Sequence, residues 1–226
     1  MKRIMKLASV LVAANLVLCL PAWADKKDPN VIVDKSRIVI QEIMASHDKG
    51  VPLDLLKNCA GIAVVPSLIK GGFVVGGAYG KGIVLAHRGA GWSGPAFLEC
   101  AMGSLGLQIG LQSVQLIMVV MGQKTMDAFL KSKFKLGGDV AIAAGPVGAR
   151  ASAATEINLK GGIYSYSRTK GLFAGISLEG AGIDMKPDIN KAYYQTAVST
   201  ADILAGKASV PASGRELIKV LDKYHR

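Results

Sequence analysis

Glycine interrupts the apolar runs of this sequence at short intervals, and this pattern constrains the fold more than any other feature. Glycine supplies 27 of the 226 residues, against an average usage of about 7%. Short apolar runs bounded by glycine are typical of strands, and glycine inside a strand marks a bend, a bulge or a close backbone approach. The glycines have no period of three, which excludes collagen. With 50% hydrophobic residues, disorder of the whole chain is also excluded.

The pattern predicts many short strands and a few helices in one domain that spans residues 25–226. The expected fold class is α+β, with a mainly antiparallel, strongly bent glycine-rich β-sheet or partial barrel and flanking helices. Strands are expected at 61–66, 72–77, 82–86, 94–102, 105–111, 117–120, 140–144, 153–158, 163–168 and 172–178. Helices are expected at 34–46, 53–58, 123–131 and 215–223.

A short repeat within the sequence predicts two similar hairpins. Lys70 precedes Gly71-Gly72 and is followed by Lys81, while Lys160 precedes Gly161-Gly162 and is followed by Lys170. If both segments form hairpins, their turns place cationic side chains near strand ends.

Residues 1–24 have the three parts of a secretory signal peptide. A basic start precedes an apolar stretch at 7–20, and the small residues Ala22 and Ala24 permit cleavage. A retained membrane anchor and lipidation of Cys19 are the alternatives. We therefore expect an exported protein that resides in the periplasm or cell envelope or is secreted.

The formal charge of +11 favours an anionic partner. Removing Lys2, Arg3 and Lys6 with the signal peptide leaves +8 on 202 residues. The cations are spread along the chain without the stacking aromatics typical of nucleic-acid binders. Membrane lipid is therefore the favoured partner, ahead of nucleic acid.

Familiar catalytic and metal-binding motifs are not found. The glycine-rich run 76–82 lacks the hydroxyl residue of a phosphate loop, and no serine-hydrolase elbow occurs. Cys59 and Cys100 predict either one disulfide or two buried free thiols. Four carboxylates lie among apolar strands, where each is either an acid of raised pKa or a satisfied structural group: Glu99, Asp139, Glu156 and Glu179. Three histidines are not spaced for a shared metal site: His47, His87 and His225.

Trp92 lies in the turn-like segment 91–95. Its ring has an apolar body and a polar edge, so it is either an interfacial membrane anchor or a side chain packed over a turn.

Several motifs together resemble the SYLF domain family, which includes yeast actin-binding proteins and exported bacterial members. They occur in family order from about residue 53 to 211, and as a set they are specific. The matching segments are 61–66, 70–73, 79–82, 92–95, 106–110, 143–148, 165–180 and 203–206.

The resemblance implies a phospholipid-binding module without enzyme activity or cofactor, with phosphoinositide preference in eukaryotic relatives and actin binding in some fungal ones. For this chain we expect anionic phospholipid as the partner and no nucleic acid. A structural or protein-interaction module of the cell envelope is the alternative. The candidate lipid-binding residues, by matching position or weaker analogy, are Lys70, Lys81, Arg88, Lys160, Arg168 and Lys170, with Trp92 as membrane anchor.

Overall fold

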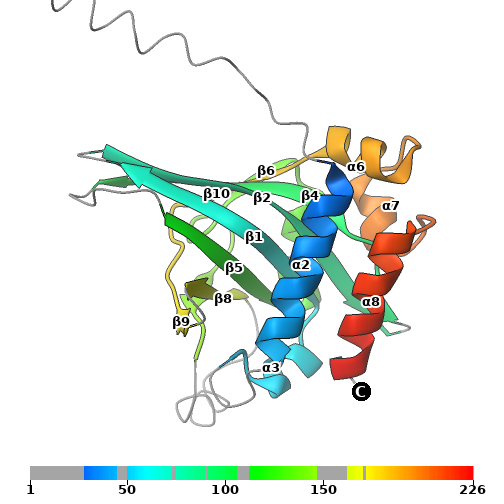
Figure 1. Ribbon diagram of the computed structural model, residues 1–226, viewed down its shortest axis with the longest axis horizontal. Helices are drawn as coiled ribbons and strands as arrows, with labels where there is room; N and C mark the ends of the chain where they lie inside the picture. The colour runs from blue at the N-terminus through cyan, green and yellow to red at the C-terminus, as the bar shows by residue number, and fades with distance from the viewer. Residues whose placement is uncertain are drawn as a thin grey trace, which may run out of the picture.

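A curled ten-stranded sheet with helices along one side forms the molecule (Figure 1). The structure is a computed structural model, and it describes residues 28–44, 50–72, 75–89, 91–105, 112–146, 162–169 and 172–225. The strand order is β6-β10-β4-β2-β1-β5-β8-β7, with β3 paired to β2 and β9 paired to β8. Every named strand pairing except β7 with β8 is antiparallel. The expected α+β class with a bent, mainly antiparallel sheet is confirmed.

The element bounds are as follows. The strands are β1 Gly61–Gly72, β2 Val75–Arg88, β3 Gly91–Trp92, β4 Ala96–Leu105, β5 Gln112–Met121, β6 Lys133–Lys135, β7 Ile142–Ala144, β8 Gly162–Thr169, β9 Leu172–Gly175 and β10 Gly182–Met185. The helices are α2 Pro29–Met44, α3 Leu53–Lys57, α4 Gln123–Met126, the 3₁₀ helix η1 Asp127–Leu130, α6 Pro187–Tyr194, α7 Thr200–Leu204 and α8 Ala212–His225.

The two central strands are longer than the glycine pattern predicts. The expected strand at 61–66 continues through Pro66 to Gly72, because a register shift between Val65 and Leu68 accommodates the proline, which has no N–H to donate. The expected strands at 72–77 and 82–86 are not separate, since β2 runs from Val75 to Arg88. Glycine did not end these strands, because strands on both sides pair with them.

Two glycines of β2 allow the sheet to curl tightly. A Cβ built on Gly82 would lie 2.2 Å from the carbonyl oxygen of Val64, and one on Gly80 would lie 2.6 Å from that of Ser67. Both distances are shorter than real Cβ contacts, so the backbone of β1 approaches β2 only because these side chains are missing. The bend therefore depends on particular glycines.

Helices α2 and α6 anchor the helical layer on the sheet. Helix α2 contacts β1 and β2, and Val33 and Ile40 on it are fully buried. From α6, the Tyr193 ring packs edge-on against Phe97 of β4 with centroids 5.1 Å apart. The buried Asn190 side chain accepts a hydrogen bond of 2.8 Å from the Phe97 N–H. Together with α8, these contacts cover one side of the sheet (Figure 1).

The predicted helices are present with shifted bounds. Helix α2 begins at Pro29, ahead of the expected 34–46, and the Asp28 carboxylate accepts the N–H of Asn30 at its start. The expected helix 123–131 is α4 followed by η1, and 215–223 lies within α8. The expected strand 153–158, most of 105–111 and the signal peptide fall outside the described residues. Within the described part of the chain, no helix is long and apolar enough to cross a membrane.

Candidate functional site

Lys70 lies near the end of β1, as the hairpin expectation implied. It faces Ala78 of β2 and Gln112 of β5 across the sheet. Strands β8 and β9 pair antiparallel, as the second predicted hairpin requires. The first predicted hairpin is wrong in its turn, because the expected strands at 72–77 and 82–86 form one strand, β2, which pairs antiparallel with β1. Among the described residues, Lys70 makes no ion pair. Within the described part of the chain, it is therefore a cation at a strand end that no acidic side chain pairs with.

Lys81 was expected near a hairpin turn, but it lies in the middle of β2. It is the first residue of a register row that runs across β2, β4, β10 and β6, namely Lys81, Glu99, Asp184 and Lys133. Its Nζ is 3.9 Å from the Glu99 carboxylate, which also lies 3.4 Å from Nζ of Lys186. The Nζ of Lys133 lies 3.2 Å from a carboxylate oxygen of Asp184. The charges of this row are thus largely balanced within the protein.

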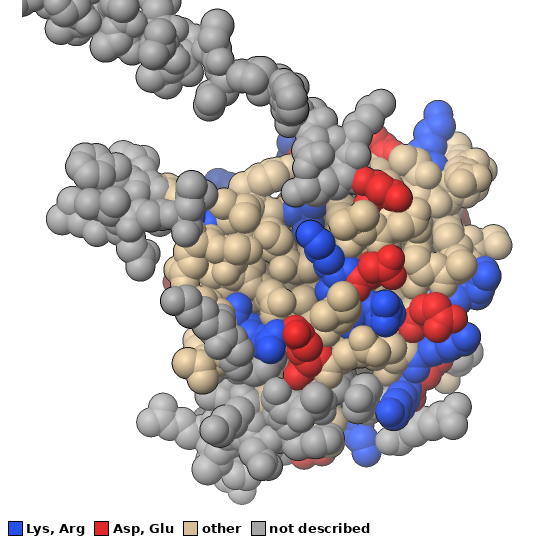
Figure 2. Space-filling view, viewed as in Figure 1, with Lys and Arg blue, Asp and Glu red and all other residues tan. Residues whose placement is uncertain are grey.

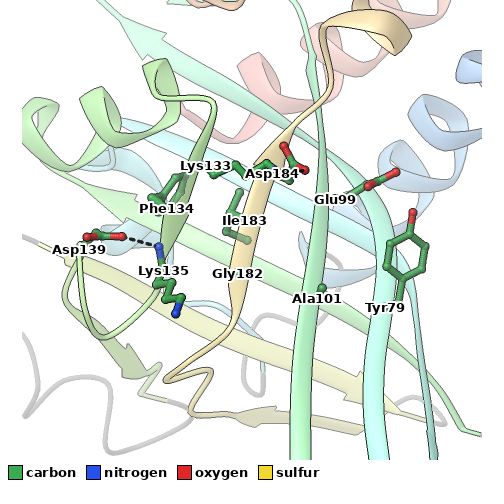
Figure 3. A pocket seen from close by; sticks show the side chains of 10 residues that line it. All are labelled: Tyr79, Glu99, Ala101, Lys133, Phe134, Lys135, Asp139, Gly182, Ile183 and Asp184. Atoms are coloured by element: carbon green, nitrogen blue, oxygen red, sulfur yellow. Dashed lines mark hydrogen bonds and ion pairs between the residues drawn. The ribbon is translucent and has the colours of Figure 1, made fainter.

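A groove of about 450 Å³ lies beside this charged row (Figure 3). Tyr79 stands at one end and Asp139 at the other, with Ala101 and Gly182 between them. Ala101 has only a methyl group and Gly182 has no side chain, so the bottom of the groove is formed close to the strand backbone. The Asp139 carboxylate accepts the Lys135 N–H at 2.7 Å, so it closes a local turn.

The groove holds little that could act as a general acid or base. Glu99, which the sequence left open as an acid of raised pKa, is a carboxylate satisfied by two lysines. Partial burial and the hydrogen-bonded, negatively charged Glu99 raise the pKa of Tyr79, so its hydroxyl stays protonated at neutral pH. Glu179 is exposed, and Glu156 lies outside the described residues. The described residues contain no cluster of three potential metal ligands.

Arg168 of β8 binds groups from two other elements. Its guanidinium forms an ion pair with Glu42 near the end of α2 and donates a 3.1 Å hydrogen bond to the Gln115 side chain of β5. The side chain is only 20% exposed. Arg168 therefore connects the helical layer to the sheet.

Arg88 and Trp92 lie toward the other end of β2 from Lys70. The Arg88 side chain donates a 2.7 Å hydrogen bond to the carbonyl of Leu204. Trp92 is half-buried, and its ring packs edge-on against His87 at 5.1 Å. Because Lys70 pairs with Ala78 whereas Trp92 pairs with His87, the structure does not bring these candidates together on one patch. Lys160 and Lys170 lie outside the described residues.

Two residues at the projecting part of the sheet were not singled out from the sequence. Ile69 and Tyr79 are direct register partners on β1 and β2, and their side chains are 43% and 48% exposed. The alternation of side chains along a strand could have identified them as exposed. It identifies them only once the register of β1 against β2 is known.

The cysteines take the second of the two expected arrangements. Cys59 and Cys100 are buried free thiols. Burial raises the pKa of Cys59 to about 12 and that of Cys100 to about 11.

Comparison with known proteins identifies the family. The family model Ysc84, described as "Las17-binding protein actin regulator", matches residues 101–224. SH3 domain-containing YSC84-like protein 1 of Xenopus laevis is 34% identical over 180 residues, which cover 78% of this chain and 53% of the relative. The chain belongs to the Ysc84 family. This confirms the resemblance to the SYLF domain, which is the same family.

Other Ysc84 relatives match over a similar length. Protein YSC84 of Saccharomyces cerevisiae is 30% identical over 179 residues, which cover 77% of this chain and 38% of the relative. The yeast LAS seventeen-binding protein 3 is 31% identical and is covered to 39%. The chain thus spans about half, or less, of the length of these relatives.

Proposed function

We propose that this Ysc84 domain is a non-enzymatic module that binds the surface of an anionic phospholipid membrane. The observation that carries the proposal is Lys70, a cation without an ion pair among the described residues, at a sheet end whose opposite face exposes Ile69 and Tyr79. One lysine near an anionic surface contributes about 1 kcal/mol. The formal charge of +8 that remains after removal of residues 1–24 adds a long-range attraction of the same sign.

The state of the carboxylates supports a binding role rather than a catalytic one. In the groove, Glu99 and Asp184 pair with lysines and Asp139 closes a turn. A general base needs a carboxylate positioned to accept a proton from a substrate. These three already have partners within the protein.

The proposed place of action is the cell envelope, because residues 1–24 have the pattern of a signal peptide. Sequencing the N-terminus of the protein recovered from its native host tests this part. A new N-terminus at Asp25 is expected, whereas an intact Met1 in the recovered protein would contradict export with cleavage.

Vesicle flotation tests lipid binding. We expect the protein to float with phosphatidylcholine vesicles that contain phosphatidylglycerol, to stay behind with pure phosphatidylcholine, and to be released by salt. Lys70→Glu weakens binding more than the matched charge reversal Lys191→Glu on the exposed side of α6. Equal flotation with neutral and anionic vesicles, or none with either, contradicts the proposal.

A protein-binding function is the second candidate, because the family description and one relative's name specify Las17 binding. Crosslinking in intact cells, followed by capture of the protein, tests it. A partner retained after lipid is removed with detergent supports this candidate, and the absence of any crosslinked protein counts against it.

A further inference from the structure

One end of the sheet carries almost no charge. It consists of the described residues 69–72 of β1, 75–79 of β2, 101–105 of β4 and 112–115 of β5, and we call it the uncharged sheet end. Lys70 is its single charged residue. The strands reach beyond the helices at this end (Figure 1), whereas acidic and basic side chains gather over the helices (Figure 2).

The surface of the uncharged sheet end combines two exposed, largely apolar side chains with glycines that have no side chain. Ile69 and Tyr79 stand side by side on β1 and β2. In the next register row on the same face, Gly77 lies opposite Gly103. A Cβ on Gly103 would meet no described atom within 4 Å. Packing therefore does not require this glycine, in contrast to Gly82 deeper in the same sheet.

The backbone of the two central strands at this end is suited to a medium with little water. Strands β1 and β2 lie inside the sheet, and each pairs with a strand on both sides. Their N–H and C=O groups in the register are directed at neighbouring strands rather than at solvent. These two strands can leave water without the large penalty of unpaired backbone groups. The outer edges of β4 beyond Ala101 and of β5 before Gln115 have no register partner among the described residues, and they stay at the hydrated headgroups.

The charged row sets a limit to this surface. Lys81 follows Tyr79 by two residues on the same face of β2, about 7 Å farther along the strand. With Glu99, Asp184 and Lys133 it forms a line of ion-paired groups across four strands. Immersion up to this line costs little electrostatic free energy, whereas immersion beyond it desolvates charges.

We propose that the uncharged sheet end enters the interfacial layer of an anionic bilayer end-on, so that Ile69 and Tyr79 on one face lie among the acyl chains and glycerol groups and Lys70, on the opposite face, reaches the phosphates. This inference rests on the proposed lipid binding and adds how and where the domain binds. Tyrosine suits this depth, because its ring is apolar and its hydroxyl keeps a polar partner, here the Glu99 carboxylate. A bilayer fits better than a second copy of the chain, because the uncharged sheet end has a cation and no carboxylate to pair with it.

A pair of matched isoleucine variants tests the contact. Ile69 on β1 and Ile38 on α2 are both exposed, at 43% and 46%, so aspartate at either position places its charge where water can reach it, and urea denaturation of both variants controls for a difference in stability. We expect Ile69→Asp to lower partitioning onto phosphatidylglycerol-containing vesicles by roughly tenfold or more, because a charge replaces an inserted side chain. Ile38→Asp should leave partitioning nearly unchanged.

A fluorescent label gives a second readout that does not depend on affinity. Ile69→Cys and Ile38→Cys are each labelled with an environment-sensitive dye in the protein that begins at Asp25, which lacks Cys19 and in which Cys59 and Cys100 are buried and therefore protected. Addition of anionic vesicles should shift the emission of the dye at position 69 to the blue and leave the dye at 38 unchanged.

The outcomes separate the two proposals. If the wild-type protein floats and Lys70→Glu weakens it, yet both aspartate variants bind alike and neither dye shifts, insertion is wrong and lipid binding stands. If the wild-type protein binds no vesicle, both proposals fail. If light scattering shows a dimer without lipid that Ile69→Asp dissociates, the uncharged sheet end is covered by a second copy and the inference is overturned.

Discussion

Arg168 illustrates how the role of a single residue depends on partners distant in sequence. The sequence suggests a cation near a hairpin turn, available for a lipid headgroup. In the structure, Glu42 and Gln115 bind its guanidinium from α2 and β5. Lys70, with similar sequence surroundings at the first hairpin, has no ion-pair partner among the described residues. Motif matching treats the two alike, and only the fold distinguishes them.

Replacing Arg168 therefore affects stability. We expect Arg168→Ala to lower the free energy of unfolding by about 1–2 kcal/mol, because a charged hydrogen bond is lost and the partly exposed Glu42 is screened by water. Arg37→Ala, which removes a looser 3.8 Å pair with Asp34 on the same helix, should cost less than about 1 kcal/mol. Urea denaturation of the two variants measures the difference, and equal costs would show that Arg168 does not tie α2 to the sheet.

At the scale of the element, β2 shows that glycines in one strand have different roles. Gly80 and Gly82 are required where the β1 backbone crosses close by. Gly77 lies in the uncharged sheet end, where a Cβ would be 3.5 Å from the Met102 carbonyl oxygen, an ordinary contact. The sequence indicates that the sheet is bent, but it does not indicate which glycines bend it, since that depends on the register with β1.

Alanine substitution separates these roles. Gly82→Ala should destabilise the protein by about 3 kcal/mol or more, because the methyl group collides with rigid backbone at Val64 and the curl must open. Gly103→Ala on β4 should change stability by less than about 0.5 kcal/mol, because the space around it is open. Thermal or urea unfolding compares the two, and a neutral Gly82→Ala would refute the close approach of β1.

At the scale of the whole molecule, burial determines the state of groups that the sequence left ambiguous. The spacing of Cys59 and Cys100 was compatible with a disulfide or with two thiols. Cys59 precedes β1 and Cys100 lies in β4, and both enter the common hydrophobic core as free thiols. Their raised pKa values follow from this burial and link the stability of the fold to pH.

Stability should therefore decline at alkaline pH. The ordinary pKa of 9.0 applies to both thiols in the unfolded chain, and burial raises it to about 12 for Cys59 and about 11 for Cys100. Between the unfolded-state pKa and the folded-state pKa of each thiol, the unfolded state binds fewer protons than the folded state. The free energy of unfolding therefore falls as pH rises through this interval. At about pH 8 and below, well under the unfolded-state pKa, the two states bind nearly equal numbers of thiol protons and this contribution is constant. Chemical denaturation from pH 8 to about 11 measures the slope.

A cysteine variant isolates the thiols in this experiment. Cys59→Ala should reduce the alkaline slope, while the raised pKa values of buried tyrosines such as Tyr166 preserve part of it. An unchanged slope in the variant would show that the Cys59 thiol does not titrate differently in the two states.

Sequence alone determined the fold class, the hairpin of β8 and β9 and the family, because glycine spacing, hydrophobic alternation and motif order can be read along the chain. The tertiary structure decided the strand lengths, the balanced charge row from Lys81 to Lys133, the partners of Arg168 and the pairing of Ile69 with Tyr79. These features depend on the register between strands that are distant in the sequence. A one-residue shift in that register would move a side chain to the opposite face of the sheet, so its neighbours and its exposure are properties of the assembled sheet.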